Sequence, residues 1–139
     1  MNEAARRVIL IWPDGAGDAA LPGLPGDAIV ARWDPGAEDG GRTELLASVR
    51  DARAMVAARG GNADDLTLVG FGRGAVAAAG LTRYARRLGI GLGPVVCVAP
   101  AWDEPDPFSG APLAEVPERV ELVDHADDVP AVITCWRPR

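Results

Sequence analysis

The sequence has little of the chemistry that metal sites and disulfide frameworks need. Its 139 residues include one histidine, His125, and two cysteines, Cys97 and Cys135. These three residues do not have the spacing of zinc ligands, so we expect no metal. Both cysteines stand in β-type runs, which predicts buried structural thiols rather than a disulfide or a pair of nucleophiles.

Long apolar runs and basic stripes are also missing. The longest apolar runs, such as residues 95–101, are too short to cross a bilayer. A net charge of −6 disfavours nucleic acid as a partner. The apolar run after Arg6 and Arg7 stops at Pro13 and Asp14, which is short for a signal peptide. We therefore expect a single domain over residues 1–139, cytoplasmic and binding neither membrane nor nucleic acid.

The order of apolar patterns along the chain predicts an α/β fold. Apolar residues at helical spacing indicate helices over residues 43–59, with Thr43 as N-cap, and over residues 75–88, ended by Gly89. Strands alternating with these helices imply a mostly parallel sheet. Short β-branched runs indicate strands at residues 7–12, 28–33, 66–69, 94–99, 119–124 and 131–136. Few residues separate the last two strands, which favours an antiparallel C-terminal hairpin.

One stretch combines a strand, a glycine turn and an alanine-rich helix. The turn reads Gly70-Phe71-Gly72-Arg73-Gly74, one residue away from the Gly-x-Ser-x-Gly nucleophile elbow. Gly72 stands where that elbow carries its serine. The stretch also fits the dinucleotide fingerprint Gly-x-Gly-x-x-Ala, but the following strand does not end in the acidic residue that this fingerprint requires. We expect no cofactor.

This order of elements resembles the α/β-hydrolase superfamily, in particular its small thioesterase-like members. Residues 8–17 look like an early strand of the family and the oxyanion loop that follows it, with Trp12 in place of the usual histidine. Residues 120–130 look like the late strand and acid turn, where Asp127 or Asp128 matches the acid. The resemblance covers about residues 7–130 and implies a truncated three-layer domain with a sheet of about six strands.

The family's chemistry does not carry over with the fold. Gly72 offers no nucleophile, and residues 126–139 contain no histidine to accept a proton. Glycine accepts a positive φ, so the elbow itself is expected to persist, with the amides of Arg73 and Gly74 forming a cradle for a carbonyl or carboxylate. The alternative is that the glycines serve only close packing of helix on strand.

Several other side chains are candidates for a site at the carboxyl edge of the sheet. Asp14, His125 and Asp128 are candidates for acid–base chemistry; the alternative is turn-forming aspartates and a surface histidine. Tryptophans near this edge either pack in the core or form an aromatic wall. The candidate ligand-binding residues are Trp12, Gly15, Phe71, Gly72, Arg73, Gly74 and Trp102.

Three hypotheses of function follow. The first is a pseudo-hydrolase that binds an acyl-type or hydrophobic small molecule, or a partner protein, in a biosynthetic context. The second is a non-hydrolytic enzyme, such as a cyclase, isomerase or dehydratase, that works without a cofactor. The third is a structural or oligomerising module. Sheet faces and edges left bare by truncation need covering, so we expect a homodimer.

Overall fold

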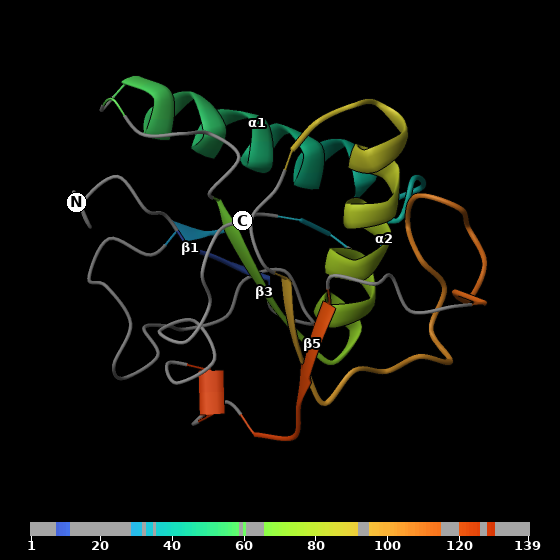
Figure 1. The fold of residues 1–139 in the computed structure, drawn as a ribbon. Helices are drawn as coiled ribbons and strands as arrows, with labels where there is room; N and C mark the ends of the chain where they lie inside the picture. Colours follow the sequence, from blue (N-terminus) through green and yellow to red (C-terminus); the bar gives the residue numbers. More distant parts are fainter. Residues whose placement is uncertain are drawn as a thin grey trace.

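The computed structural model describes residues 8–11, 29–31, 33–34, 36–58, 60, 66–91, 95–114, 120–125 and 128–129. From β2 to β4 strands and helices alternate, with a further strand, β1 and β5, at each end of the series (Figure 1). In chain order they are β1 (Val8–Ile11), β2 (Ile29–Val30), α1 (Arg42–Ala58), β3 (Thr67–Phe71), α2 (Arg73–Arg87), β4 (Val95–Val98) and β5 (Val120–Val123).

The strands form one parallel sheet in the order β2-β1-β3-β4-β5. The α/β class and the parallel pairing predicted from the sequence are therefore confirmed. β5 pairs in parallel with β4, with Val98 opposite Val123. The strand predicted at residues 131–136, and with it the C-terminal hairpin, lies outside the described residues. Because all pairings are parallel, the carboxyl ends of the strands meet at one edge.

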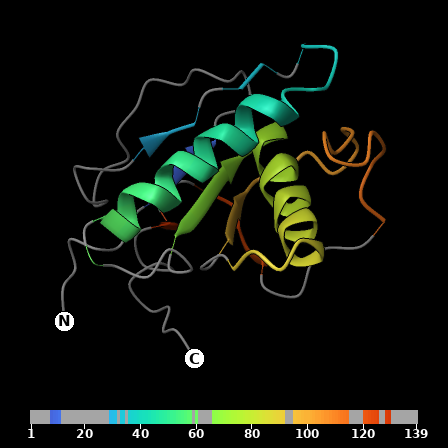
Figure 2. The same cartoon turned by 90° about the horizontal axis from the view of Figure 1, so that it is seen from above.

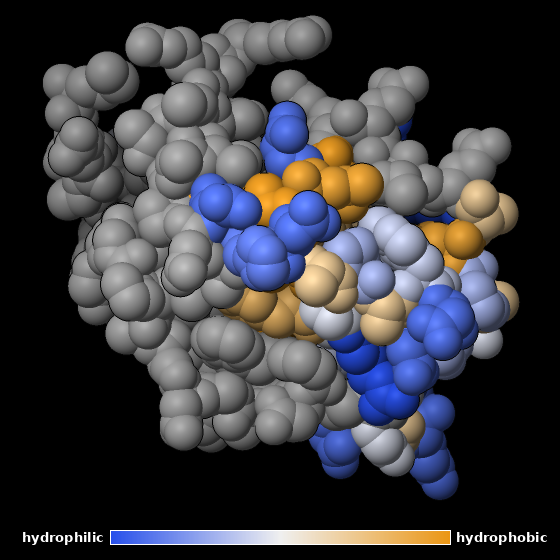
Figure 3. Space-filling model, turned by 90° about the horizontal axis from the view of Figure 1, so that it is seen from below, coloured by the Kyte–Doolittle hydropathy of each residue, from blue (hydrophilic) through white to orange (hydrophobic). Residues whose placement is uncertain are grey.

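Both helices lie on the same face of the sheet (Figure 2). α1 buries Leu45, Val49, Ala52 and Val56, a spacing of three to four residues that forms one apolar stripe. α2 instead buries a run of small residues from Gly74 to Gly80, which lets its backbone approach the strands closely. No described helix covers the opposite face, so the third layer stays a prediction. On the side seen in Figure 3, apolar side chains lie close beside hydrophilic ones.

The predicted N-cap of the first helix is wrong. α1 begins at Arg42, so Thr43 already lies inside it. Asp39 accepts hydrogen bonds from the backbone N–H groups of Gly41 (2.9 Å) and Thr43 (3.0 Å). Hydrogen bonding from Thr43 is the main cause that lowers the pKa of Asp39 to about 2. Gly40 and Gly41 have φ values of 70° and 88°, and this turn brings the Asp39 carboxylate to the first turn of the helix.

Thr67, the first residue of β3, carries a buried hydroxyl. The residue is 1% exposed, and its Oγ1 makes no hydrogen bond within the described part of the chain. An unsatisfied buried hydroxyl costs about 1–3 kcal/mol. We expect Thr67→Val to raise the free energy of unfolding by about 1 kcal/mol in urea titrations. Thr67→Ser keeps the hydroxyl and loses a methyl, so it should destabilise the protein. A destabilised valine variant would mean that the hydroxyl is satisfied.

Asp106 packs against α2 at a position that only glycine accommodates. Asp106 is 2% exposed, and its Oδ1 accepts a hydrogen bond from the Phe108 N–H at 3.0 Å. A Cβ at Gly80 would lie 1.8 Å from that same oxygen. The contact holds the segment after β4 against the helix.

Gly80→Ala is therefore expected to destabilise the protein, although alanine is the better helix former by about 1 kcal/mol. We expect a net loss of about 1–3 kcal/mol in the free energy of unfolding. In an Asp106→Ala background the same substitution should cost nothing or stabilise, because the clashing carboxylate is gone. Additive effects of the two substitutions in a double-mutant cycle would show that the contact does not constrain the helix.

Candidate functional site

The glycine turn joins the carboxyl end of β3 to the start of α2. Phe71 ends the strand, Arg73 begins the helix, and Gly72 between them has φ 56° and ψ −116°. The Gly72 N–H donates to the Val98 carbonyl at 3.0 Å, and the Gly72 carbonyl accepts from the Ala101 N–H at 3.1 Å. Both backbone polar groups of Gly72 are thus hydrogen-bonded to the chain at the end of β4. The turn has the sharp strand-to-helix form expected of an elbow.

The flanking glycines serve close packing. A Cβ at Gly70 would lie 2.4 Å from the Gly74 carbonyl oxygen, and a Cβ at Gly74 would lie 2.1 Å from the Ile11 carbonyl oxygen. These distances are far below van der Waals contact, so any side chain at either position would force helix, β3 and β1 apart. Close packing therefore explains Gly70 and Gly74. Gly72 differs from them because its positive φ reflects the turn itself.

The first amides of α2 lie at this turn, where Gly72 and Arg73 are partly exposed and Gly74 is buried. Within the described residues, the N–H groups of Arg73 and Gly74 donate to no acceptor. Gly72, the N-cap, offers no side chain to accept from them. The first N–H groups of a helix carry partial positive charge and attract carboxylates and other anions. The turn therefore holds two donors at the edge of the sheet, and its central residue, Gly72, carries no nucleophilic side chain.

A second unusual backbone conformation lies beside the turn. Ala99, which follows β4, has φ 43°, the only positive φ of a non-glycine residue in the described ranges. Its N–H donates to the Val123 carbonyl at 2.9 Å. A left-handed residue with a side chain costs about 1–3 kcal/mol, and such strain concentrates at functional sites. Gly72 and Ala99 are linked through Val98, whose carbonyl accepts from Gly72.

An ion pair fixes one side chain next to the amides. The Arg73 guanidinium lies 3.0 Å from Glu104, and both side chains are partly exposed. Glu104 belongs to the segment after β4, 31 residues further along the chain. No local sequence pattern indicates this pair, because only the parallel pairing of β3 with β4 brings the two segments together. The pair places a charged, partly exposed rim beside the two amides.

The predicted acid–base residues are only partly brought together. His125 and Asp128 follow β5 and are linked by a hydrogen bond from the Asp128 N–H to the His125 carbonyl, 3.0 Å long. Both are exposed. β4 lies between β5 and β3, which separates His125 from the turn by two strand spacings, about 10 Å. Asp14 lies outside the described residues, as do Trp12, Gly15 and Asp127.

The aromatic candidates pack inward where the structure describes them. Trp33 is 4% exposed and belongs to the core, so packing is confirmed for this residue. Phe71 is 7% exposed, and Trp102 is partly buried against the same core. Among the three aromatic candidates that the structure describes, only Trp102 is partly exposed near the turn. The thiol of Cys97 is buried, as predicted. Cys135 and Trp136 lie outside the described ranges.

Two further findings concern the described residues alone. No helix there is long and apolar enough to cross a membrane. No three side chains of histidine, cysteine, aspartate or glutamate gather there as a group that could hold a metal ion. Comparison of the chain with protein-family models, with curated proteins and with solved structures found no match.

Proposed function

We propose that this protein is a non-hydrolytic, α/β-hydrolase-like binding protein that holds the carbonyl or carboxylate of an acyl-type small molecule at the Gly72 turn. The observation that carries the proposal is the turn itself. It has a positive φ at Gly72 and two amides, those of Arg73 and Gly74, that donate to no acceptor among the described residues, and Gly72 itself carries no side chain that could attack a bound carbonyl. Hydrogen-bond donors without a nucleophile bind an acyl group and leave it intact.

The surroundings of the turn support a binding role. Ala99, the residue directly after β4, has a strained backbone conformation. The residue before it, Val98, accepts a hydrogen bond from the Gly72 N–H. Close packing of α2 on the sheet requires Gly70 and Gly74 but gives no reason for a strained alanine on the neighbouring strand. Trp102, partly exposed beside the same strand end, offers an apolar surface for the body of the ligand.

A thiol introduced at the turn tests the proposal. In a Cys135→Ala background, the Gly72→Cys thiolate would attack p-nitrophenyl acetate, expel p-nitrophenolate and keep the acetyl group as a thioester. If the Arg73 and Gly74 amides stabilise the oxyanion, the rate per thiolate should exceed that of a solvent-exposed thiol at least about tenfold. The nearby helix N-terminus should also lower the thiol pKa below about 8.5.

Gly110→Cys in the same background is the matched control. Gly110 also has a positive φ (76°), and nothing lies within 4 Å of a Cβ placed there. Cys97 does not interfere, because burial raises its pKa to about 12. Absorbance of p-nitrophenolate gives the rates, and mass spectrometry locates the acetyl group. Equal rates per thiolate for the two variants would rule out a cradle at Gly72.

A further inference from the structure

A closed ring of contacts holds Glu104 beside the Gly72 turn. The Gly72 carbonyl accepts from the Ala101 N–H at 3.1 Å, and the Ala101 carbonyl accepts from the Glu104 N–H at 3.0 Å. The ring closes where the Arg73 guanidinium meets the Glu104 carboxylate at 3.0 Å. Two backbone hydrogen bonds and one ion pair therefore join residues 101–104 to two consecutive residues of the turn. The Arg73 side chain is paired with a carboxylate whose own backbone is fixed to the same turn.

The charged groups on the neighbouring strand ends are acidic. β4 and β5 end at the same edge of the sheet as β3, because all three strands are parallel. Arg73 supplies one positive charge at this edge, and Glu104 compensates it. A carboxylate that approaches the turn therefore meets a net negative charge, whereas a neutral carbonyl is not repelled. Within the described ranges, the segments that follow β4 and β5 contain no arginine or lysine and five acidic residues, Asp103, Glu104, Asp106, Asp124 and Asp128.

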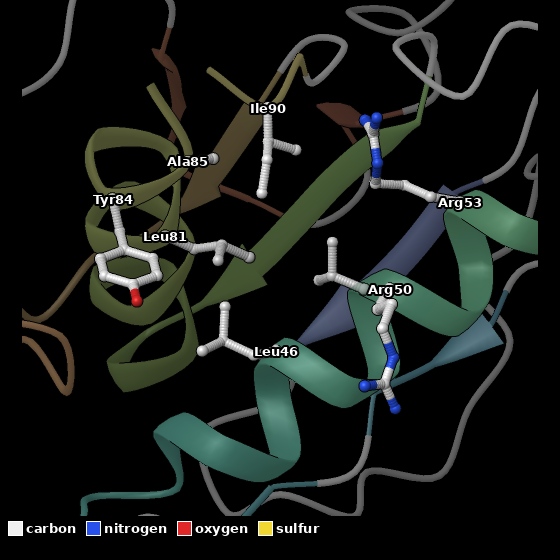
Figure 4. A pocket seen from close by; sticks show the side chains of 8 residues that line it. Leu46, Arg50, Arg53, Leu81, Tyr84, Ala85 and Ile90 are labelled. Atoms are coloured by element: carbon white, nitrogen blue, oxygen red, sulfur yellow. The ribbon is translucent and has the colours of Figure 1, made fainter. Parts of the chain in front are cut away.

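The other described arginines of the two helices lie apart from the turn. Arg42 begins α1 and stands beside Asp39, to whose carbonyl its N–H donates at 3.3 Å. Arg50 and Arg53 line a separate hollow of about 120 Å³ between α1 and α2, and the Arg50 guanidinium points away from that hollow (Figure 4). No residue of the turn lines the hollow. Three arginines of α2 lie ten or more residues after Arg73, about 15 Å or more along the helix axis, namely Arg83, Arg86 and Arg87.

We propose that Glu104 makes the Gly72 turn select a neutral acyl group, such as an ester, an amide or a lactone, over a free carboxylate. The proposal rests on the function proposed for the turn and narrows its class of ligand. An arginine without a partner would pair with a carboxylate and favour an acid at the turn. Glu104 occupies that arginine and leaves the amides of Arg73 and Gly74 as donors, which suit a carbonyl oxygen. The partial charge of a helix N-terminus, about half a unit, is smaller than the acidic charge around it.

Two alkylating reagents of nearly equal size test this selectivity. Iodoacetamide is neutral and iodoacetate is a carboxylate, and a thiolate displaces iodide from either one to form a thioether. In the Gly72→Cys, Cys135→Ala protein, the rate with iodoacetamide divided by the rate with iodoacetate is independent of the thiolate fraction, because one thiol reacts with both. Mass spectrometry measures the two rates. Relative to N-acetylcysteinamide, an uncharged thiol in solution, this ratio should be about threefold higher or more.

Two further substitutions, each removing one charge of the pair, should shift this ratio in opposite directions. Glu104→Gln frees Arg73 and should lower the ratio about threefold to tenfold, in favour of iodoacetate. Arg73→Gln keeps the backbone N–H but leaves Glu104 uncompensated, so it should raise the ratio. A pair that only fixed the segment would give shifts of one sign, because either substitution breaks the same contact.

Asp103→Asn is the matched control, because it removes an exposed charge from the same segment and leaves the pair intact. Its shift should be smaller than that of Glu104→Gln. Shifts of the same sign for Glu104→Gln and Arg73→Gln would overturn the proposal. Equal shifts for Glu104→Gln and Asp103→Asn would also overturn it, because selectivity would then come from the acidic segment as a whole.

The reaction with p-nitrophenyl acetate separates the failure of this proposal from the failure of the proposed function. If Gly72→Cys reacts faster per thiolate than Gly110→Cys while Glu104→Gln leaves the alkylation ratio unchanged, the cradle is present and Glu104 does not set its selectivity. Equal rates of the two cysteine variants with the ester would overturn the proposed function, and with it the class of ligand inferred from Glu104.

Discussion

The Gly74→Ala substitution is expected to destabilise the protein more than any other substitution that adds a single methyl group to the described part of the contact between sheet and helix. The new Cβ would lie 2.1 Å from the Ile11 carbonyl oxygen and 2.8 Å from its carbon, and both are backbone atoms that no side-chain rotation can move. Relief requires α2 to shift away from β1, which would loosen the core around Ile9, Ile11 and Ala75. We expect a loss of about 4 kcal/mol or more in the free energy of unfolding.

Urea unfolding followed by tryptophan fluorescence measures this loss. Gly110→Ala is the matched control, because Gly110 also has a positive φ but nothing within 4 Å of its Cβ position. It should cost about 1–2 kcal/mol from backbone strain alone. A stability of several kcal/mol is typical of a domain of this size, so Gly74→Ala brings the protein close to unfolding. Similar losses in the two variants would mean that the close approach of α2 to β1 is absent in solution.

The sequence predicts the fold around the turn well because the signals there are local. An apolar run followed by three alternating glycines and an alanine-rich helix permits few structures other than a buried strand, a tight turn and a closely packed helix. The clash distances at Gly70 and Gly74 give the physical reason for two of the glycines. The conformation of Gly89 is also predictable from the sequence, because a glycine directly after a helical pattern favours the left-handed C-terminal cap.

The features that escaped prediction depend on contacts or conformations that no local pattern records. Asp39 reaches the first turn of α1 only because Gly40 and Gly41 both adopt positive φ. The Arg73–Glu104 pair and the Asp106–Gly80 contact join segments more than twenty residues apart. Ala99 has a left-handed conformation that nothing in its sequence neighbourhood indicates, because alanine strongly disfavours it. At the proposed site, the strained Ala99 and the Arg73–Glu104 pair are therefore visible only in three dimensions.

The second large effect concerns pH. The Cys97 side chain is fully buried, its Sγ lies 3.4 Å from the Ala75 carbonyl oxygen, and burial raises its pKa from 9.0 to about 12. Above pH 9 the unfolded chain releases this proton, whereas the folded protein retains it. The stabilisation is therefore complete below pH 9 and is lost as the pH rises toward 12. The expected slope is about 1.4 kcal/mol per pH unit, or roughly 3 kcal/mol between pH 9 and pH 11.

The composition of the chain makes this slope unusually easy to assign. The protein contains no lysine and a single tyrosine, Tyr84, so few other side chains titrate between pH 9 and pH 11. In a Cys135→Ala background Cys97 is the one remaining thiol. Adding Cys97→Ala should lower stability by about 1–2 kcal/mol at pH 7, through the cavity it leaves, and should flatten the alkaline decline. Urea titrations at half-unit intervals of pH distinguish the two backgrounds. If the free energy of unfolding declines equally with pH in both proteins, Cys97 ionises as readily in the folded protein as in the unfolded chain. The burial of its thiol against α2 would then be incorrect.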